Sequence, residues 1–299
     1  MASSISTLSP NPLPNICSHA HLSPHLSQMG ILRSLNLNRR ISNRRFNAVS
    51  AAIKQDTTLW TQATLVKVKP AAESLFHIGI DVSESPELCA SYERAGQYLQ
   101  LKIGDFPKPS FLAIASPPSL AKEKGVFEFL VKSVAGSTAE ALCGLEKGDV
   151  VELTKAMGGG FDLDRISPPE EYPVIFIFAT GSGISPIRSL IESGSGFGAD
   201  KRSDVRLYYG ARNLRRMAYQ DRFNDWESSG VKIVPVLSQP DSSWEGESGF
   251  VQAAFAKAKC IFKPQGTGAV LCGQKQMTEE VTSLLVADGV SAEKILKNF

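Results

Sequence analysis

The segment Pro173-Val-Ile-Phe-Ile-Phe-Ala-Thr-Gly-Ser-Gly-Ile-Ser-Pro186 determines the fold of the second half of the chain. Its first part, 173–179, is a continuous apolar run, which is typical of a strand buried on both faces of a parallel sheet. Ser185 is the expected N-cap of the following helix, and Pro186 suits the first helical position. We therefore predict a strand, a tight glycine turn and a helix in direct succession.

Glycines at a strand-to-helix turn let the backbone approach a pyrophosphate, which the helix N-terminus stabilises. The Gly-x-Gly pattern of Gly181 and Gly183 is weak by itself, because Pro186 replaces the third glycine of the usual fingerprint. The context strengthens it. Three more strands are expected at Val205–Tyr209, Val231–Leu237 and Ala269–Leu271, alternating with helices at Tyr219–Glu227, Phe250–Ala258 and Gln276–Ala287.

This βαβ alternation predicts an open parallel sheet. Ligands of such sheets bind beyond the carboxyl ends of the strands. Gly181, Gly210 and Gly273 each follow one of these predicted ends. We therefore expect the three glycines in one crevice that binds a dinucleotide.

The preceding part of the chain has a different pattern, with short β-branched and aromatic runs separated by Pro, Gly and Ser. The expected strands are Thr61–Lys69, Leu75–Val82, Gln97–Ile103, Phe111–Ala115, Val126–Lys132 and Asp149–Leu153. This spacing predicts a small antiparallel barrel or sandwich. The small residues Gly136-Ser137-Thr138 at the start of a helix indicate either a nest for an anionic phosphate or an ordinary Gly/Ser turn.

The first fifty residues form a region of their own. They contain many serines and five arginines, and no Asp or Glu occurs before Asp56. This composition is typical of an organelle transit peptide, with a disordered tail as the alternative. Because the start is rich in Ala and Ser and the arginines come late, we expect residues 1–50 to direct the protein to the chloroplast stroma.

Composition narrows the chemistry. The 32 Lys+Arg are balanced by 30 Asp+Glu, which argues against a nucleic-acid surface. The longest apolar run is too short to cross a bilayer. Outside the first fifty residues His77 is the only histidine, and no two cysteines form a Cys-x-x-Cys pair. We therefore expect neither a metal site nor a Ser–His–acid triad, and any redox centre should be a bound organic cofactor.

With these motifs in place, the sequence resembles the ferredoxin–NADP reductase family of flavoprotein oxidoreductases, most of all its plastid-targeted plant members. The resemblance covers about residues 58–299. It depends on the order of several motifs rather than on any single one. They are Gly96-Gln97-Tyr98, Gly136-Ser137-Thr138, Gly159-Gly160-Phe161, Gly181-Ser182-Gly183-Ile184-Ser185-Pro186, Tyr208-Tyr209-Gly210-Ala211-Arg212, Leu237-Ser238-Gln239-Pro240, and Cys272-Gly273 with Met277.

The resemblance implies a β + α/β fold. An N-terminal antiparallel flavin-binding β-barrel would span 58–165, and a C-terminal Rossmann-like parallel-sheet NAD(P)-binding domain would span 170–299. It also implies FAD or FMN, together with NADP or NAD, as cofactors. A hydride would pass between nicotinamide and flavin, and a separate electron carrier such as ferredoxin would be the partner.

Particular residues follow from the resemblance. Those expected to hold the flavin are Gly96, Gln97, Tyr98, Ala113, Ile114, Ala115, Ser116, Gly136, Ser137 and Thr138. Those expected to hold the dinucleotide are Thr180, Gly181, Gly183, Ile184, Pro186, Gly210, Ala211, Arg212, Cys272, Gly273 and Met277. Cys272 beside the nicotinamide and Phe299 over the flavin ring are the expected catalytic residues, with a buried thiol and a frayed end as the alternatives.

Arg212 has a separate role to consider. Its guanidinium, with Arg215 and Arg216 close by, suits an adenosine 2′-phosphate, which favours NADP. A solvated basic segment is the alternative, and NAD therefore stays open.

Two departures from the family pattern concern the flavin. Ser110-Phe111-Leu112-Ala113 stands where members carry an Arg-x-Tyr-Ser/Thr run, so the phosphate-binding Arg is missing. Lys297 stands where plant reductases have a glutamate. The main hypothesis is a flavin-dependent NAD(P)H oxidoreductase. The alternatives are a nucleotide-binding sensor or scaffold with weakened catalysis, and a subunit that is active only with its redox partner.

Overall fold

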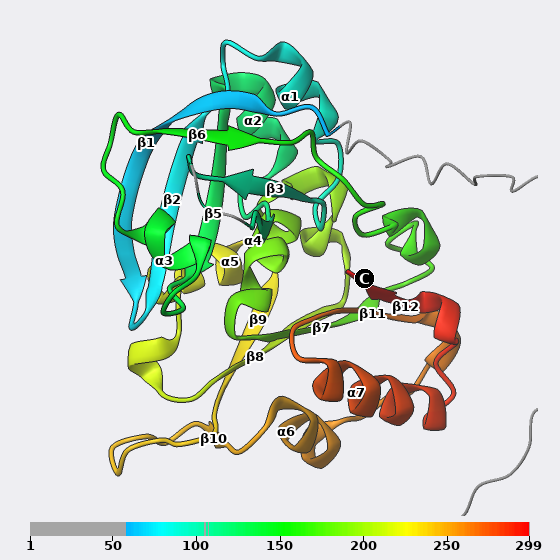
Figure 1. Ribbon diagram of the computed structural model, residues 1–299. Helices are drawn as coiled ribbons and strands as arrows, with labels where there is room; N and C mark the ends of the chain where they lie inside the picture. Colours follow the sequence, from blue (N-terminus) through cyan, green and yellow to red (C-terminus); the bar gives the residue numbers. More distant parts are fainter. Residues whose placement is uncertain (1–57, 105, 107, 299) are drawn as a thin grey trace, which may run out of the picture. The chain divides into compact units, whose positions relative to one another are not determined.

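The computed structural model describes residues 58–104, 106 and 108–298. The predicted transit peptide and Phe299 lie outside these residues. The described residues belong to one compact unit that contains two six-stranded sheets. Figure 1 shows the first sheet in blue to green and the second in green to red. Both sheets share the unit, so the proposed domain boundaries at 165 and 170 stay predictions.

The first sheet is antiparallel, in the order β4-β3-β6-β1-β2-β5. Its strands are β1 (Thr61–Ala72), β2 (Leu75–Asp81), β3 (Tyr98–Lys102), β4 (Ser110–Ala113), β5 (Val126–Lys132) and β6 (Val150–Leu153). The two edge strands meet through an Ile114–Phe129 bridge and an Ala115 N–H to Glu128 carbonyl bond of 2.7 Å. The sheet therefore closes into the predicted barrel.

Apolar and polar residues alternate along the barrel strands, and the apolar side chains fill the interior. Phe127 and Phe129 on β5 are fully buried, whereas Glu128 between them points to the other side of the strand. Leu65, Ile78 and Leu99 join them in one apolar cluster. Three short helices border the barrel: α1 (Pro86–Ser91), α2 (Pro118–Lys124) and α3 (Thr138–Cys143).

The second sheet is parallel, in the order β10-β9-β8-β7-β11-β12. Its strands are β7 (Val174–Thr180), β8 (Asp204–Ala211), β9 (Val231–Leu237), β10 (Glu247–Ser248), β11 (Thr267–Cys272) and β12 (Ile295–Lys297). The sequence motifs predicted β7, β8, β9 and β11 but neither short edge strand. Two and three residues are too few for a periodic signal.

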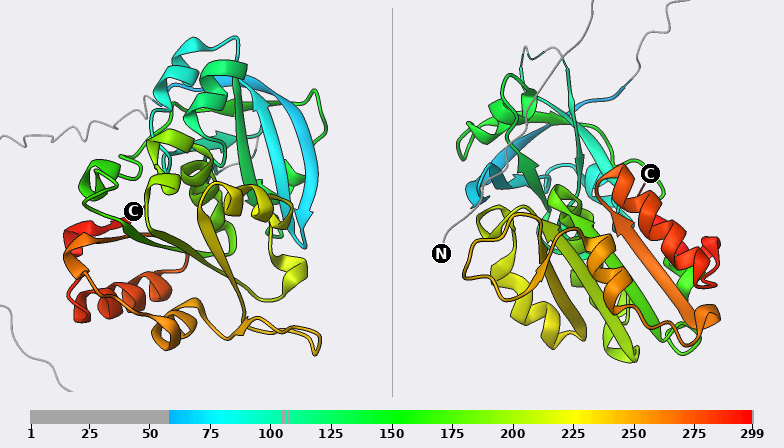
Figure 2. Two further views of the ribbon diagram at one scale, coloured as in Figure 1. Left: turned by 180° about the vertical axis from the view of Figure 1, so that it is seen from behind. Right: turned by 90° about the horizontal axis from the view of Figure 1, so that it is seen from below.

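Helices cover both faces of this sheet (Figure 2). They are α4 (Ile184–Glu192), α5 (Phe223–Ser228), α6 (Val251–Ala258) and α7 (Lys275–Ala287). Ile187 of α4 and Trp226 of α5 pack on one face, and Phe255 of α6 and Val281 of α7 pack on the other. Because apolar residues are buried on both faces, β7 has the continuous apolar run that marked it in the sequence.

Two details of the predicted helices are wrong. α4 begins at Ile184 with Gly183 as its N-cap. Ser185 is buried instead, and its hydroxyl donates to the carbonyl of Ala113 in the barrel at 3.1 Å. The helix predicted from Tyr219 starts only at Phe223, because Tyr219 has a left-handed φ of 63° and a short 3₁₀ turn follows. In the described part of the chain, no helix is long and apolar enough to span a membrane.

A buried ion pair joins the barrel to α4. Arg188 Nη2 lies 2.6 Å from Glu128 Oε2, and His77 Nε2 lies 3.1 Å from the other oxygen of that carboxylate. Burial alone would raise the pKa of Glu128, but His77 and Arg188 outweigh it and hold this pKa far below its usual value. His77 therefore helps to hold the buried Glu128–Arg188 pair that links the two halves.

Candidate functional site

Thr180 is the centre of the carboxyl edge of the parallel sheet. Its hydroxyl accepts a 3.0 Å hydrogen bond from the Gln274 amide. A β-carbon added at Gly210 would lie 3.2 Å from the Thr180 methyl, and one added at Gly273 would overlap the Thr180 hydroxyl. Gly210 near the end of β8 and Gly273 after β11 thus both pack against Thr180, the last residue of β7, and a side chain at either position would clash.

The turn after β7 is closed underneath and open above. A β-carbon at Gly183 would overlap the carbonyl of Cys272, while one at Gly181 would meet nothing within 4 Å. Gly181 has a φ of 55°, a conformation that glycine adopts without strain. Gly181 and Ser182 are exposed, whereas Ile184 and Pro186 are buried beneath them. The exposed backbone at the start of α4 fits a dinucleotide pyrophosphate.

Cys272 connects this edge to the barrel. Its thiol is 4% exposed and accepts a weak hydrogen bond from Asn298 Nδ2 at 4.0 Å. A β-carbon at Gly96 of the barrel would lie 2.9 Å from Asn298 Oδ1. Burial raises the pKa of Cys272 to about 12, so its thiol is neutral near pH 7. Phe299, the other predicted catalytic residue, lies outside the described residues.

Several residues expected to hold the flavin make contacts within the protein. The Gln97 side chain accepts from the amides of Glu93 and Arg94 at 2.8 and 2.9 Å and donates to the Gly158 carbonyl at 3.1 Å. The Ile114 amide donates to the Gln97 carbonyl at 3.1 Å. The Ala115 amide donates to the Glu128 carbonyl, and the Ser116 hydroxyl accepts from the Glu128 amide. These amide groups are therefore already bonded within the barrel edge, and the flavin contacts expected at Ile114 and Ala115 stay predictions.

The turn at Gly136–Thr138 already binds an anionic group. Ser137 caps α3 by accepting from the Glu140 amide, and the Gly136 amide donates to the Glu140 carboxylate at 2.7 Å. The Thr138 hydroxyl donates to the Lys108 carbonyl. The nest predicted for a flavin phosphate thus contains a carboxylate of the chain itself. The Ser-x-x-Glu spacing of a capping box was the sequence signal for this arrangement.

The barrel offers a better fit to a flavin ring than to its phosphates. Tyr98 and the exposed Phe111 are neighbours, with ring centroids 6.1 Å apart and planes inclined by 51°. Gly158 packs so tightly on Tyr98 that a β-carbon would lie 2.9 Å from its ring. Ala113 is partly exposed at the end of β4. Tyr98, Phe111 and Ala113 lie on neighbouring positions of β3 and β4, and their apolar side chains suit contact with an aromatic ring system.

The remaining predicted residues lie at the carboxyl edge of the parallel sheet or beneath it. Arg212 is exposed just beyond β8, where the Ala211 carbonyl accepts from the Ser238 amide at 3.0 Å. Met277 is buried under Gly273. Sequence reasoning missed Asn298, because nothing in its sequence position shows that the chain end returns to Cys272.

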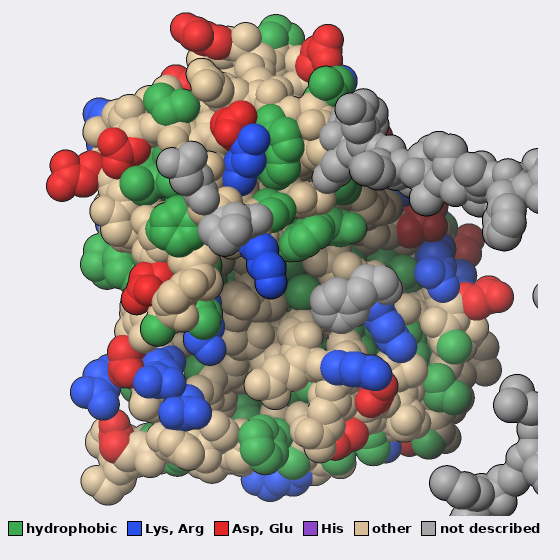
Figure 3. Space-filling model, in the orientation of Figure 1, with side chains coloured by type: hydrophobic (Ala, Val, Ile, Leu, Met, Phe, Trp, Pro, Cys, Tyr) green, Lys and Arg blue, Asp and Glu red, His purple; other side chains and the backbone are tan. Residues whose placement is uncertain are grey.

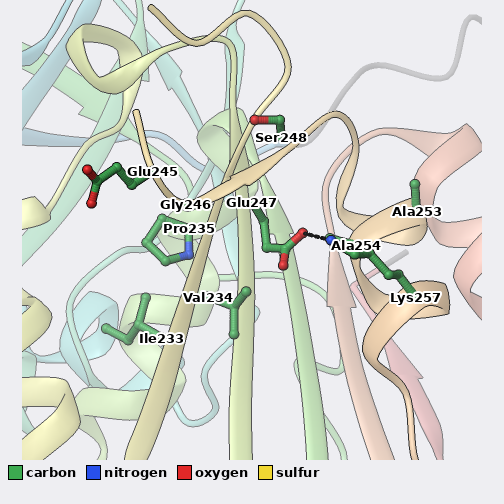
Figure 4. Close-up of a pocket in the computed structure, with 10 residues that line it drawn as sticks. All are labelled: Ile233, Val234, Pro235, Glu245, Gly246, Glu247, Ser248, Ala253, Ala254 and Lys257. Carbon is green, nitrogen blue, oxygen red and sulfur yellow. Dashed lines mark ion pairs between the residues drawn. The ribbon is translucent and has the colours of Figure 1, made fainter. Parts of the chain in front are cut away.

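One hollow of the described residues lies away from this edge. It has a volume of about 600 Å³ and lies between β9, β10 and α6. Lys257 Nζ lies 3.6 Å from Glu247 Oε2 within it, an ion pair marked by the dashed line in Figure 4. None of the predicted cofactor residues lines it. Among the described residues, no group of three His, Cys, Asp or Glu side chains is placed to hold a metal ion.

Comparisons with known proteins agree with this geometry. Residues 177–283 match the oxidoreductase NAD-binding domain family. The chain is 49% identical to the fruit protein pKIWI502 of Actinidia deliciosa, over 95% of this chain and 93% of that protein. This chain belongs to the ferredoxin reductase-like FAD/NAD(P)-binding oxidoreductases. The family consists of flavin-dependent NAD(P)H oxidoreductases that use FAD.

More distant similarities cover parts of the chain. The reductase component DmpP of phenol 2-monooxygenase from Pseudomonas sp. (strain CF600) is 32% identical over 64% of this chain, which spans about half (53%) of DmpP. A ferredoxin NADP+ reductase from Neisseria gonorrhoeae with bound FAD and NADP superimposes with a TM-score of 0.64 at 20% identity, over 80% of this chain and 99% of that one. The latter similarity shows the fold.

Proposed function

We propose that this reductase-family protein transfers a hydride between a nicotinamide dinucleotide and a flavin, and that the electrons pass to or from a separate acceptor. One observation supports the proposal above all others. Asn298 lies between Gly96 of the predicted flavin site and Cys272 at the predicted nicotinamide site. The two ligand-binding edges therefore adjoin each other, as a direct transfer between two ring systems requires.

Each part of the chain has a distinct task in this proposal. The flavin supplies the redox chemistry when it is bound. The exposed turn at Gly181 binds the pyrophosphate of the dinucleotide, and the closely packed Gly183 and Gly273 set the depth at which the nicotinamide lies. Cys272 contributes a neutral thiol that excludes water without competing as a nucleophile. Phe111 and Tyr98 offer a stacking surface for the flavin.

The test is anaerobic reduction of the full chain with added flavin. The protein is incubated with FAD or FMN, mixed with NADH or NADPH, and followed by visible absorption. We expect the flavin band to bleach much faster than free flavin under the same conditions. Bleaching at the rate of free flavin with every cofactor pair would contradict the proposal.

A second candidate function is a nucleotide-binding protein with weakened catalysis. The Glu140 carboxylate at the Gly136 amide favours it, together with the missing Arg at Ser110, because both reduce flavin phosphate binding. This candidate predicts NAD(P)H binding without bound flavin and without turnover. A protein purified with near-stoichiometric flavin that oxidises NAD(P)H would exclude it. Activity that appears only with an added redox partner would instead favour the subunit hypothesis.

Location and partner complete the proposal. The Ser- and Arg-rich composition of residues 1–50 supports import into the chloroplast stroma. A soluble carrier such as ferredoxin is then the expected electron partner. Fusion of residues 1–54 to a fluorescent protein tests the first point, since diffuse cytosolic fluorescence would contradict it. Reduction of ferredoxin by NADH or NADPH, compared with reduction of an artificial acceptor, tests the second.

A further inference from the structure

The turn between β1 and β2 reaches from the barrel to the parallel sheet. The amide of Glu73 in this turn donates to the Arg215 carbonyl at 2.7 Å. Arg216 donates to Glu73 Oε1 through Nε at 3.0 Å and through Nη2 at 2.6 Å. The preceding Ala71 and Ala72 pack on the core of the parallel-sheet half. Figure 1 shows the tip of this hairpin next to the segment that follows β8.

The segment that Glu73 contacts lies at the nucleotide-binding edge. Residues 212–216 follow the carboxyl end of β8, and the Arg212 carbonyl accepts from the Gln239 amide of the loop after β9 at 2.8 Å. In dinucleotide-binding sheets, the ribose 2′-position is recognised beyond the end of the second strand of the nucleotide-binding unit. With β7 as the first strand, that place is the end of β8.

The charges at this place determine whether binding of a 2′-phosphate is favourable. Glu73 holds Arg216, and its second oxygen lies 4.0 Å from Arg215 Nε. The pKa of Glu73 is lowered, first by the Arg216 hydrogen bond and then by the charges of the three arginines, so this carboxylate is ionised at neutral pH. Among the described residues, Arg212 forms no ion pair within 4.0 Å, although its charge also acts on Glu73; Arg216 is the guanidinium that Glu73 binds directly. Figure 3 shows basic and acidic side chains mixed at the lower left of the view, where Figure 1 has the tip of the β1–β2 hairpin and the segment after β8.

We propose that Glu73 is a specificity-determining residue that makes the protein prefer NADH to NADPH. It occupies the donor groups of Arg216 that would otherwise bind a 2′-phosphate, and it places a negative charge where that phosphate would lie. The plain ribose of NADH carries no charge at this position and is unaffected. The inference rests on the proposed dinucleotide site and adds to it the choice between the two dinucleotides.

The test uses nucleotide fragments, so that no flavin or turnover is needed. Binding of 5′-ADP and 2′,5′-ADP to the full chain is measured by calorimetry for the wild type and for Glu73→Gln. We expect the wild type to prefer 5′-ADP. Glu73→Gln should raise the affinity for 2′,5′-ADP about tenfold and change that for 5′-ADP little. Adding Arg216→Gln should abolish the gain.

Glu87→Gln is the matched control, because Glu87 is an exposed carboxylate paired with Lys155 at 2.7 Å on the barrel side. It should leave both affinities unchanged. An unchanged affinity ratio in Glu73→Gln, with both fragments bound, overturns the inference and leaves the proposed function intact. A wild-type protein that binds 2′,5′-ADP more tightly than 5′-ADP also overturns the inference and leaves the proposed function intact. Binding of neither fragment overturns the inference and the proposed function together.

Discussion

The turns at Gly136–Thr138 and Gly181–Gly183 have similar sequences but differ in whether their backbone is already bonded to a side chain of the protein. Both are Gly/Ser turns at the start of a helix. In the first, the Gly136 amide is bonded to the Glu140 carboxylate. In the second, Gly181 is exposed, has open space around it and is supported by the close contact of Gly183 with Cys272. Such a motif thus predicts the geometry of an anion nest, while a residue three or four positions further on decides whether the nest is free.

The largest expected difference between the two turns is in their tolerance of a side chain. Gly183→Ala places a methyl group against the Cys272 carbonyl, and neither backbone segment can easily move away. We expect a loss of about 3 kcal/mol in the free energy of unfolding. Gly136→Ala meets nothing within 4 Å and suffers only its positive φ of 74°, which costs about 1 kcal/mol.

Urea unfolding of both variants beside the wild type measures these values. Equal losses in the two variants would mean that the turns do not differ in packing. Gly181→Ala, with a φ of 55° and open space, is the internal control and should resemble Gly136→Ala. A Gly181→Ala variant as unstable as Gly183→Ala would remove the basis for calling the second turn open.

A smaller effect is expected when the first turn is freed. Glu140→Gln removes the negative charge at the Gly136 amide and weakens the bond that occupies it. The affinity for FAD should then rise about tenfold, because a phosphate accepts charge-assisted bonds from free amides. Flavin fluorescence titration measures this change. Glu146→Gln, an exposed carboxylate in the loop after α3, is the control; an equal gain there would indicate general charge repulsion instead.

The two turns also show how far sequence reasoning reaches. The apolar run before Thr180 and the short β-branched and aromatic runs of the first half predicted both sheets, because burial on one or two faces leaves a direct mark on the residue pattern. The end of β11 just before Gly273 followed from the same rule, whereas β8 continues through the expected end at Gly210 to Ala211. These signals are local or periodic, and they survive without any knowledge of tertiary contacts.

Contacts between distant segments left no such mark. Ser185 was expected to cap α4, but its hydroxyl is used by Ala113, 72 residues away. Asn298 reaches Cys272 only because β12 adds to the sheet edge beside β11. Glu73 meets Arg216 across 143 positions. Each of these depends on how the two halves pack, which neither propensity nor spacing encodes.

The smallest expected effect concerns the strand end beneath the second turn. The pKa of Cys272 is raised by burial to about 12, with the Asn298 hydrogen bond opposing this slightly. A thiol with a raised pKa stays protonated as pH rises, so no thiolate forms across the neutral range. NADH affinity should therefore show no inflection from this thiol between about pH 6 and 9. Cys272→Ser should change that affinity only about twofold, because one small neutral group replaces another.

An inflection near pH 8 to 9 that disappears in Cys272→Ser would show that the thiol reaches solvent. The contact between Gly183 and Cys272 would then not close the turn from below, and the contrast with the Gly136 turn would lose its physical cause.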